Sequence, residues 1–396
     1  MAVAPPHRTG AHNAHGGERS TSGWALGASA LLLALGFGRK PGSPPRYAGA
    51  RRPSPSDHRR GSEELGPAPR GTQRRDLRRA EEPGRGRGAT TPSEIPARGW
   101  KDILVRVYRE ISDDRVLAIA AGVTFYVLLA IFPAIGALVS IYGLFADPQS
   151  IAEHLNNASS VMPGGAIDII GEQVRRLTAQ GDTTLGLTAV VSIAISLWSA
   201  NAGMKALIDA LNIVYDETEK RGFVKLNLVS LTFTVGIIGF LLVALGAMVV
   251  LPIVLDYIGL GGATETLIKV ARWPVLFVVV AFGLACIYRY GSSRDKPKWR
   301  WITPGSAVAS FLWLAASLLF SWYAANFGSY NETYGSLGAA IGFMMWIWIS
   351  TVVILLGAEL DAEMEHQTAR DTTEGRPRPL GARGATMADT VGEATG

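Results

Sequence analysis

The stretch YGSLGAAIGFMMWIWISTVVILLGAELDAE, residues 334–363, decides the fold of this chain. Its central part, residues 337–358, carries no formal charge over 22 positions. A helix of that length, rising about 1.5 Å per residue, covers roughly the 30 Å hydrocarbon core of a bilayer. Gly338 and Gly342 lie four residues apart, a spacing that lets two helices approach closely. The stretch therefore predicts a transmembrane helix, and we expect the chain to leave the lipid at Glu359.

The composition divides the chain into unlike parts. Of its 396 residues, 48% are hydrophobic and 18% are charged, with a net charge of +5. Residues 1–95 are rich in Arg, Pro, Gly and Ser, whereas long apolar runs dominate the following 260 or so residues. We predict a disordered extension over 1–95, a membrane domain over 96–365 and a disordered tail over 366–396. The single cysteine, Cys286, cannot form an internal disulfide.

The extension allows several interpretations. An apolar run from Trp24 to Gly38 is short for a span and suits the core of a signal peptide. The segments RRPSPSDHRR (51–60) and RRDLRRAEEPGRGRG (74–88) are basic enough to bind nucleic acid or anionic lipid. The alternatives are a solvated low-complexity tail or an extension from a misassigned start codon. We favour these alternatives, and expect no nucleic-acid partner, because no aromatic residues interleave the arginines.

Apolar periodicity predicts one interfacial helix followed by six spans. Residues 100–111 place apolar side chains on one face and charged ones, including Asp102 and Arg106, on the other, which indicates an amphipathic helix in the cytoplasmic interface. Pro133 is expected to kink the first span. The spans are predicted at about residues 117–145, 185–215, 226–255, 273–290, 302–327 and 337–358.

The positions of Lys and Arg predict the orientation. The segment before the first span and the loops at 216–225 and 289–300 hold most of the basic residues outside the extension, and the alternate loops hold few. Because cytoplasmic loops carry an excess of Lys and Arg, six spans with both termini in the cytoplasm satisfy every loop.

Several stretches also carry a family likeness. The first span contains AIAAGVTFYVLLAIFPAIGALVSIYG (118–143) and the second contains LWSANAGMKALIDALNIVY (197–215). WRWITPGS (299–306), WLAASLLFSWYAANFGSYNETYGSLGA (313–339) and MMWIWISTVVILLGAEL (344–360) follow. In these stretches the chain resembles the YihY/BrkB family of bacterial inner-membrane proteins. The resemblance implies a six-helix protein of the inner membrane. It also implies a function once labelled ribonuclease, and since linked to serum resistance and to transport of envelope lipids or solutes.

A polar row on the second span is the first candidate site. Asn201, Lys205, Asp209 and Asn212 recur at helical spacing, and Lys205 and Asp209 are spaced for an ion pair. Charged residues inside spans are costly and are usually functional. The alternative is that residues 185–204 already cross the bilayer, which leaves the row in the cytoplasmic interface.

Five further residues are candidates for a pore or its mouth. Tyr126 lies on the first span, with packing as the alternative role. Asn326, Tyr330 and Tyr334 are expected at the outer mouth of the fifth and sixth helices. Glu359 is singled out by the family likeness, and its alternative role is an ordinary interface charge.

The residues do not favour an enzyme. A metal-dependent nuclease needs clustered His, Asp and Glu ligands, and no histidine falls in a predicted span. We therefore predict no catalytic residue, cofactor or metal. The predicted function is the transport or flipping of an envelope lipid or amphiphilic solute, with membrane lipid as partner. The alternatives are a non-catalytic scaffold for envelope assembly and, less favoured, a ribonuclease. The sequence does not indicate an oligomeric state.

Overall fold

The structure, a computed structural model, describes residues 70–142, 187–258, 262–327 and 336–395. The chain divides into two units, Met1–Glu64 and Leu65–Gly396, and every described residue lies in the second. Within the described residues the regular structure is helical, with one isolated antiparallel β-bridge between Pro297 and Thr373. The predicted all-α class is confirmed.

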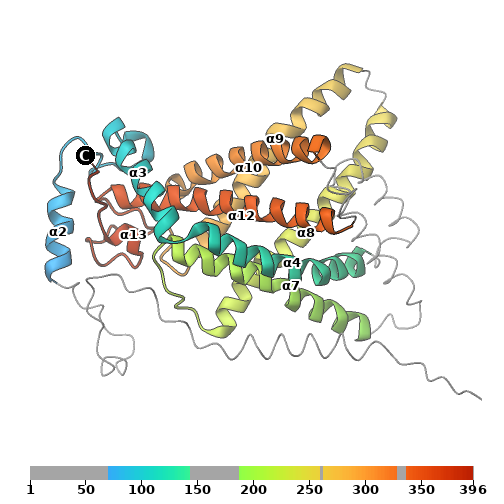
Figure 1. Cartoon of the computed structure of the whole chain (residues 1–396), viewed down its shortest axis with the longest axis horizontal. Coiled ribbons are helices and arrows are strands. Elements are labelled where there is room, and N and C mark those ends of the chain that lie inside the picture. The colour runs from blue at the N-terminus through green and yellow to red at the C-terminus, as the bar shows by residue number, and fades with distance from the viewer. Residues whose placement is uncertain (1–69, 143–186, 259–261, 328–335, 396) are drawn as a thin grey trace, which may run out of the picture. The chain divides into compact units, whose positions relative to one another are not determined.

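The long helices of the described part follow one another along the chain and are shown in Figure 1. They are α3 (Ala97–Asp113), α4 (Val116–Tyr142), α7 (Leu187–Val214), α8 (Phe223–Ile258), α9 (Gly262–Tyr290), α10 (Trp299–Phe327) and α12 (Ser336–Gln367). The shorter elements are α2 (Arg70–Ala80), the 3₁₀ turn η2 (Pro92–Glu94) and α13 (Thr386–Asp389). α4 continues through Pro133 as one helix.

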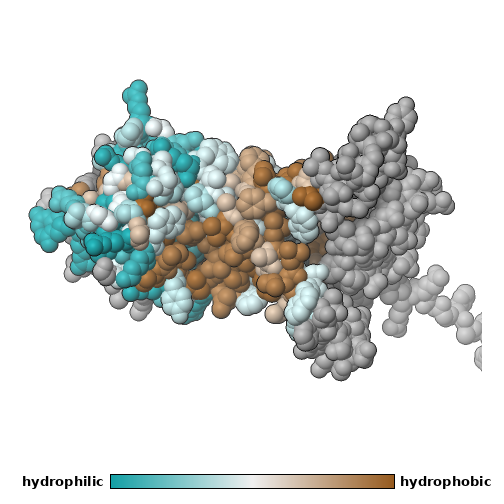
Figure 2. Space-filling view, turned by 90° about the horizontal axis from the view of Figure 1, so that it is seen from above, coloured by the Kyte–Doolittle hydropathy of each residue, from teal (hydrophilic) through white to brown (hydrophobic). Residues whose placement is uncertain are grey.

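Five helices of the described part are long and apolar enough to cross a membrane. They contain the segments Val116–Ile135, Phe223–Val243, Trp273–Tyr290, Trp299–Tyr323 and Ala340–Gln367. Many of their large apolar side chains are exposed, and they form the brown band of Figure 2. This composition is that of a membrane protein, because water would not tolerate so continuous an apolar surface. α7 is not among the five, so the count of six spans stays a prediction.

α12 is the helix around which the others pack. It contacts α3, α4, α7, α10 and α13, and it runs through the middle of the bundle in Figure 1. Leu355, Ala358 and Ala362 of α12 are fully buried in the main apolar cluster. Val116 and Ala120 of α4 belong to the same cluster. Small side chains therefore line this crossing, which lets membrane helices gain close van der Waals contact.

The closest helix approach joins α10 and α12 at two glycines. A Cβ on Gly305 would lie 2.2 Å from the Gly357 carbonyl oxygen and 2.4 Å from the Asp361 carboxylate. A Cβ on Gly357 would lie 2.7 Å from the Tyr288 hydroxyl and 2.5 Å from Ala309 Cβ. Only residues without a side chain fit here, so the crossing fixes α10, α9 and α12 against one another.

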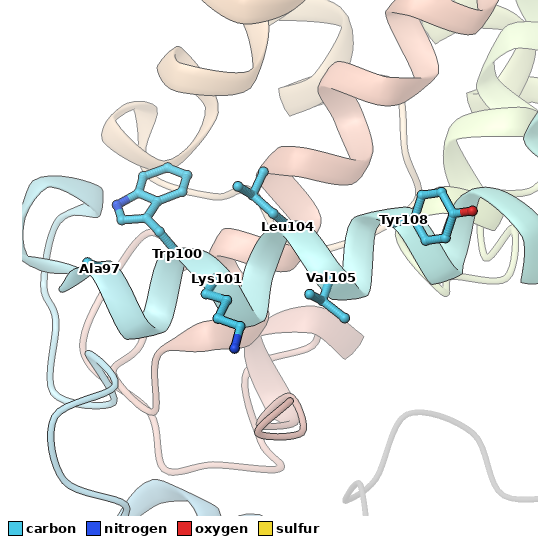
Figure 3. Close-up of a pocket in the computed structure, with 6 residues that line it drawn as sticks. All are labelled: Ala97, Trp100, Lys101, Leu104, Val105 and Tyr108. Atoms are coloured by element: carbon cyan, nitrogen blue, oxygen red, sulfur yellow. The ribbon is translucent and has the colours of Figure 1, made fainter. Parts of the chain in front are cut away.

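α3 differs from the prediction in which face it buries. Asp102 and Arg106, expected on the solvent side, are buried. Asp102 accepts hydrogen bonds from Arg85 at 2.7 Å and from the Thr395 backbone N–H at 2.9 Å. The outward face is instead formed by Ala97, Trp100, Lys101, Leu104, Val105 and Tyr108, which line a shallow surface hollow (Figure 3). Asp102 and Arg106 face inward because segments remote in the sequence supply hydrogen-bond partners for their side chains.

The C-terminal segment also differs from the prediction. Residues 368–395 follow a defined course against α3, α12 and residues 76–89, where the sequence indicated disorder. Arg87 donates to the Gly392 carbonyl at 2.7 Å, and Arg106 donates to the Glu393 carbonyl at 2.9 Å. Arg383 donates to the Ala388 carbonyl at 2.6 Å. Met387 of this segment also joins the main apolar cluster. Buried arginines that bond backbone carbonyls supply much of the remaining contact, which composition did not reveal.

Candidate functional site

The predicted polar row of α7 does not share one environment. Asn201 is buried, and its side-chain oxygen accepts a hydrogen bond from Thr234 of α8 at 3.2 Å. Lys205 is half-buried, and its Nζ atom lies 5.0 Å from the centre of the Trp198 ring. Asp209 is exposed. Asn212 is buried and accepts a hydrogen bond from the Ser293 backbone N–H at 2.7 Å. The row therefore supplies packing and loop anchoring at different places along α7.

The predicted mouth residues are partly outside the described structure. Tyr330 and Tyr334 lie outside the described residues, and Asn326 lies in α10 without a described side chain. Tyr126 of α4 is 43% exposed and packs edge to face against Phe125 at 5.7 Å. Glu359 is fully buried in α12. Of these five residues, Glu359 alone lies in the polar cluster that follows.

α12 continues past its apolar run and buries its acidic end. The helix extends to Gln367, beyond the predicted end of the span at residue 358. Glu359, Asp361, Glu363 and Glu365 are all no more than 1% exposed. Residues two apart on a helix point about 200° apart, so successive acids face different neighbours. Glu359 and Glu363, four residues apart, therefore share one face of the helix, and Asp361 and Glu365 share another.

Glu363 and Glu365 have cationic partners from remote segments. Glu363 pairs with Arg106 of α3, and His366 Nδ1 lies 3.5 Å from its other oxygen. Glu365 pairs with Arg294 at 2.9 Å and accepts a hydrogen bond from the Thr372 hydroxyl at 2.9 Å. These contacts are the compensation that a buried charge needs.

Arg294 occupies a fully buried position between α7 and α12. Its guanidinium lies 3.8 Å from the centre of the Tyr215 ring, a cation–π contact. Burial acts to lower the pKa of Arg294, but the Glu365 carboxylate and Tyr215 outweigh it and the pKa is raised. The Arg294 Nε and Nη2 atoms and the Tyr215 hydroxyl have no hydrogen-bond partner among the described residues. Several buried polar atoms at Arg294 and Tyr215 therefore lack hydrogen bonds within the described part of the chain.

Asp361 is tied to α10 through one oxygen. Its Oδ1 accepts a hydrogen bond from the Gly305 backbone N–H at 2.8 Å, and its Oδ2 has no partner among the described residues. Tyr288 of α9 donates to the Ile354 carbonyl at 2.6 Å from the neighbouring turn of α12. The absence of a side chain at Gly305 is what allows the Asp361 carboxylate to reach the backbone.

Glu359 is the least satisfied group of the cluster. Neither of its carboxylate oxygens has a hydrogen-bond partner among the described residues. The Asp114 carboxyl, at the end of α3, lies close enough to interact with it. Burial, and then the charge of Asp216, raises the pKa of Asp114 to about 7. Burial, and then Glu363, raises the pKa of the nearby Glu110 to about 7. Glu359, Asp114 and Glu110 therefore lie together with too few hydrogen-bond donors for their carboxylates.

The acids do not assemble a metal centre among the described residues. No group of three His, Cys, Asp or Glu side chains in these ranges could hold a metal ion. Sequence reasoning found Glu359 but missed Asp114, Tyr215 and Arg294. The alternating acids after the span gave no signal for burial, because acidic side chains are mostly exposed and indicate a solvated helix end.

Comparison with known proteins places the chain in a family of membrane proteins. The family model described as virulence factor BrkB matches residues 107–380. The ribonuclease-like protein YfkH of Bacillus subtilis is 29% identical over 251 residues, which cover 61% of this chain and 88% of that protein. No solved structure matches the chain.

Other relatives are named only as membrane proteins. The UPF0761 membrane protein NMB0524 of Neisseria meningitidis serogroup B is 27% identical over 276 residues, covering 66% of this chain and 62% of that protein. The UPF0761 membrane protein NTHI0384 of Haemophilus influenzae is 22% identical over 267 residues, covering 65% of this chain and 93% of that protein. The aligned part of the Neisseria relative thus falls short of two thirds of its length. The family match includes α12 and its acidic end, and the chain belongs to the virulence factor BrkB family.

Proposed function

We propose that this protein is a transporter or flippase that moves a lipid or an amphiphilic solute across the bacterial inner membrane. The observation that carries the proposal is Glu359, a fully buried carboxyl on an apolar, membrane-length helix, with no hydrogen-bond donor on its oxygens in the described part of the chain. Ionisable groups in such helices are costly and usually mark a substrate or ion pathway. A purely structural helix would gain stability from an apolar residue at this position.

Loop contacts support a cytoplasmic location for the polar end. The basic loops 216–225 and 289–300 contact each other at this end. The Lys220 backbone N–H donates to Ser293 Oγ at 2.9 Å, and Arg221 donates to the Gly291 carbonyl at 2.7 Å. Residues 76–106 and 366–395 meet at the same end (Figure 1). Because Lys and Arg concentrate on the cytoplasmic side of a membrane, we assign this end to the cytoplasm.

The outward face of α3 fits a lipid-facing role in this arrangement. Trp100, Leu104 and Tyr108 lie one turn apart on the helix, and Lys101 lies beside them (Figure 3). Tyr108 is 76% exposed and Leu104 is 57% exposed. Aromatic, apolar and basic side chains on one exposed face suit the headgroup region of a bilayer. We propose that α3 lies in that region.

Reconstitution into liposomes tests the proposed transport. Fluorescent lipids with labelled headgroups are placed in both leaflets, and a membrane-impermeant quencher reports how many reach the outer one. We expect the wild-type protein to make the inner-leaflet pool accessible and Glu359→Ala to slow that transfer at least about tenfold, the effect of a lost transition-state contribution of about 1.4 kcal/mol. Glu81→Ala is the matched control, because Glu81 is an exposed acid outside the cluster. Absence of transfer for every envelope lipid and amphiphile tested would refute transport.

The scaffold alternative makes a different prediction. A scaffold needs its surface and its fold, and it does not need a buried unpaired carboxyl. If Glu359→Ala, Lys205→Ala and Asp209→Ala each complement a deletion strain as well as the wild type does, the scaffold becomes the better interpretation.

A further inference from the structure

At the buried end of α12, two acids pair with cations and Asp361 accepts a backbone N–H, which leaves Glu359 with neither among the described residues. Glu363 faces Arg106 and His366, and Glu365 faces Arg294. Glu359, fully buried, has neither a cation nor a hydrogen-bond donor on its oxygens among the described residues. An ionised carboxylate in such a place costs several kcal/mol, so the group is expected to bind a positive ligand or a proton.

The groups that face Glu359 are themselves mostly acidic. They come from the end of α3, from α7 and from α12 itself, and they are Asp114, Glu110, Tyr215 and Glu363. The groups that face Asp114 in turn are Asp113, Asp216 and Glu363. Arg106 and His366 pair with Glu363. Two negative charges on Glu359 and Asp114 would therefore repel each other with little local compensation.

The two acids differ in their access to water. Glu359 is fully buried, whereas Asp114 is half-buried where α3 ends and α4 begins. Asp114 is the C-cap residue of α3, and its backbone N–H bonds the Glu110 carbonyl at 2.8 Å. Arg115, the next residue, takes a left-handed backbone with φ of 55°. The turn therefore fixes Asp114 between the solvent of the polar end and the buried carboxyl.

We propose that Glu359 and Asp114 hold one proton between them and exchange it with the solvent of the polar end through Asp114. A neighbouring pair of carboxyls that cannot both ionise is a known way to retain a proton near neutral pH. Burial and the charge of Asp216 raise the pKa of Asp114 to about 7, whereas its hydrogen bond to Glu359 lowers it, as expected if Glu359 carries the proton and Asp114 accepts it. A metal cation fits less well, because no group of three His, Cys, Asp or Glu side chains among the described residues could hold one.

If the pair couples transport to proton movement, the proton is the coupling ion, and that role rests on the proposed transport function. As a proton-binding pair it can be measured without transport. Infrared difference spectra of the full chain in lipid nanodiscs, recorded from about pH 5 to pH 9, report the carboxylic acid C=O stretch directly. We expect a buried carboxylic acid signal in the wild type that titrates near neutral pH.

Two variants and one control identify the acids. Glu359→Gln keeps the shape of the protonated side chain and should abolish the buried signal, which assigns that signal to Glu359. Asp114→Asn should likewise remove the near-neutral titration, and it gives an independent reading if Glu359→Gln does not fold. Glu81→Gln, at an exposed acid outside the cluster, should leave the signal unchanged.

The possible outcomes separate the proposals. A wild-type spectrum without a titrating buried acid, or one that Glu359→Gln and Asp114→Asn leave unchanged, would overturn the proton pair. A titration that shifts when choline replaces sodium and potassium would also overturn it, in favour of a metal cation. A titrating pair in a protein that moves no lipid or solute would support the pair and refute its use in transport.

Discussion

The Gly305–Gly357 crossing predicts an unusually large cost for adding one methyl group. In Gly305→Ala the new Cβ would lie 2.2 Å from the Gly357 carbonyl oxygen, about 1 Å inside ordinary contact. The same Cβ would lie 2.4 Å from the Asp361 carboxylate, which accepts the Gly305 N–H. Backbone atoms cannot rotate away, so α10 must move from α12.

The expected magnitude follows from two separate losses. Overpacking of a tight interior costs about 1–3 kcal/mol, and loss of a hydrogen bond to a buried carboxylate costs about 1.5–3 kcal/mol. Alanine returns up to about 1 kcal/mol through its helix propensity. We therefore expect Gly305→Ala to lower the free energy of unfolding by about 2–4 kcal/mol, measured by denaturant titration of the purified protein in detergent with intrinsic tryptophan fluorescence.

Gly283→Ala in α9 is the matched control. A Cβ on Gly283 would meet no atom within 4 Å, so the same substitution should be neutral or stabilise by up to about 1 kcal/mol. If the two variants unfold at the same denaturant concentration, the reasoning from close approach is refuted.

Three further predictions test the polar end. Glu365→Ala leaves Arg294 buried without its carboxylate and should cost about 3–5 kcal/mol in detergent unfolding, whereas the apolar double variant Arg294→Met with Glu365→Leu should regain most of that loss; equal stability of the two variants would contradict this. The pKa values of Asp114 and Glu110 are raised in the fold, so the folded state binds more protons than the unfolded state, and the melting temperature should fall as pH rises from about 4 through about 7. Asp114→Asn should flatten that fall, and an unchanged pH profile would count against the cluster. In a Cys286→Ser background, a bimane probe on Tyr108→Cys should be quenched by brominated lipids and one on Arg109→Cys should not; similar quenching would refute the proposed lipid-facing side of α3.

The helices were predictable because lipid imposes a simple pattern on them. A span must satisfy its own backbone and present apolar side chains, so length and hydropathy alone found α4, α8, α9, α10 and α12. Their ends were less predictable. α8 begins at Phe223 rather than near 226, and α9 begins at Gly262 rather than 273, because the helix continues through polar residues that hydropathy does not count.

The polar end was not predictable because its order depends on contacts between remote segments. Arg106 and Glu363 lie 257 residues apart, and Arg87 bonds the carbonyl of a residue 305 positions away. A single sequence shows that such residues are charged, but not which of them face each other. Charge therefore indicated solvent for Asp102 and Arg106 and disorder for residues 366–396, where the structure shows buried ion pairs and carbonyl contacts.

The unpaired state of Glu359 does not follow from a shortage of cations. Arg115 directly follows Asp114 in the chain, yet its side chain is exposed and its backbone is in the costly left-handed region. A chain selected for stability alone could have aimed this guanidinium at Asp114 and Glu359, as Arg106 and Arg294 are aimed at Glu363 and Glu365. Proteins depart from such local optimisation mainly at functional sites. Among the described residues, the other acids of the α12 end have a cation or a backbone donor and Glu359 has neither, which is the arrangement expected of a group that must gain and lose a proton.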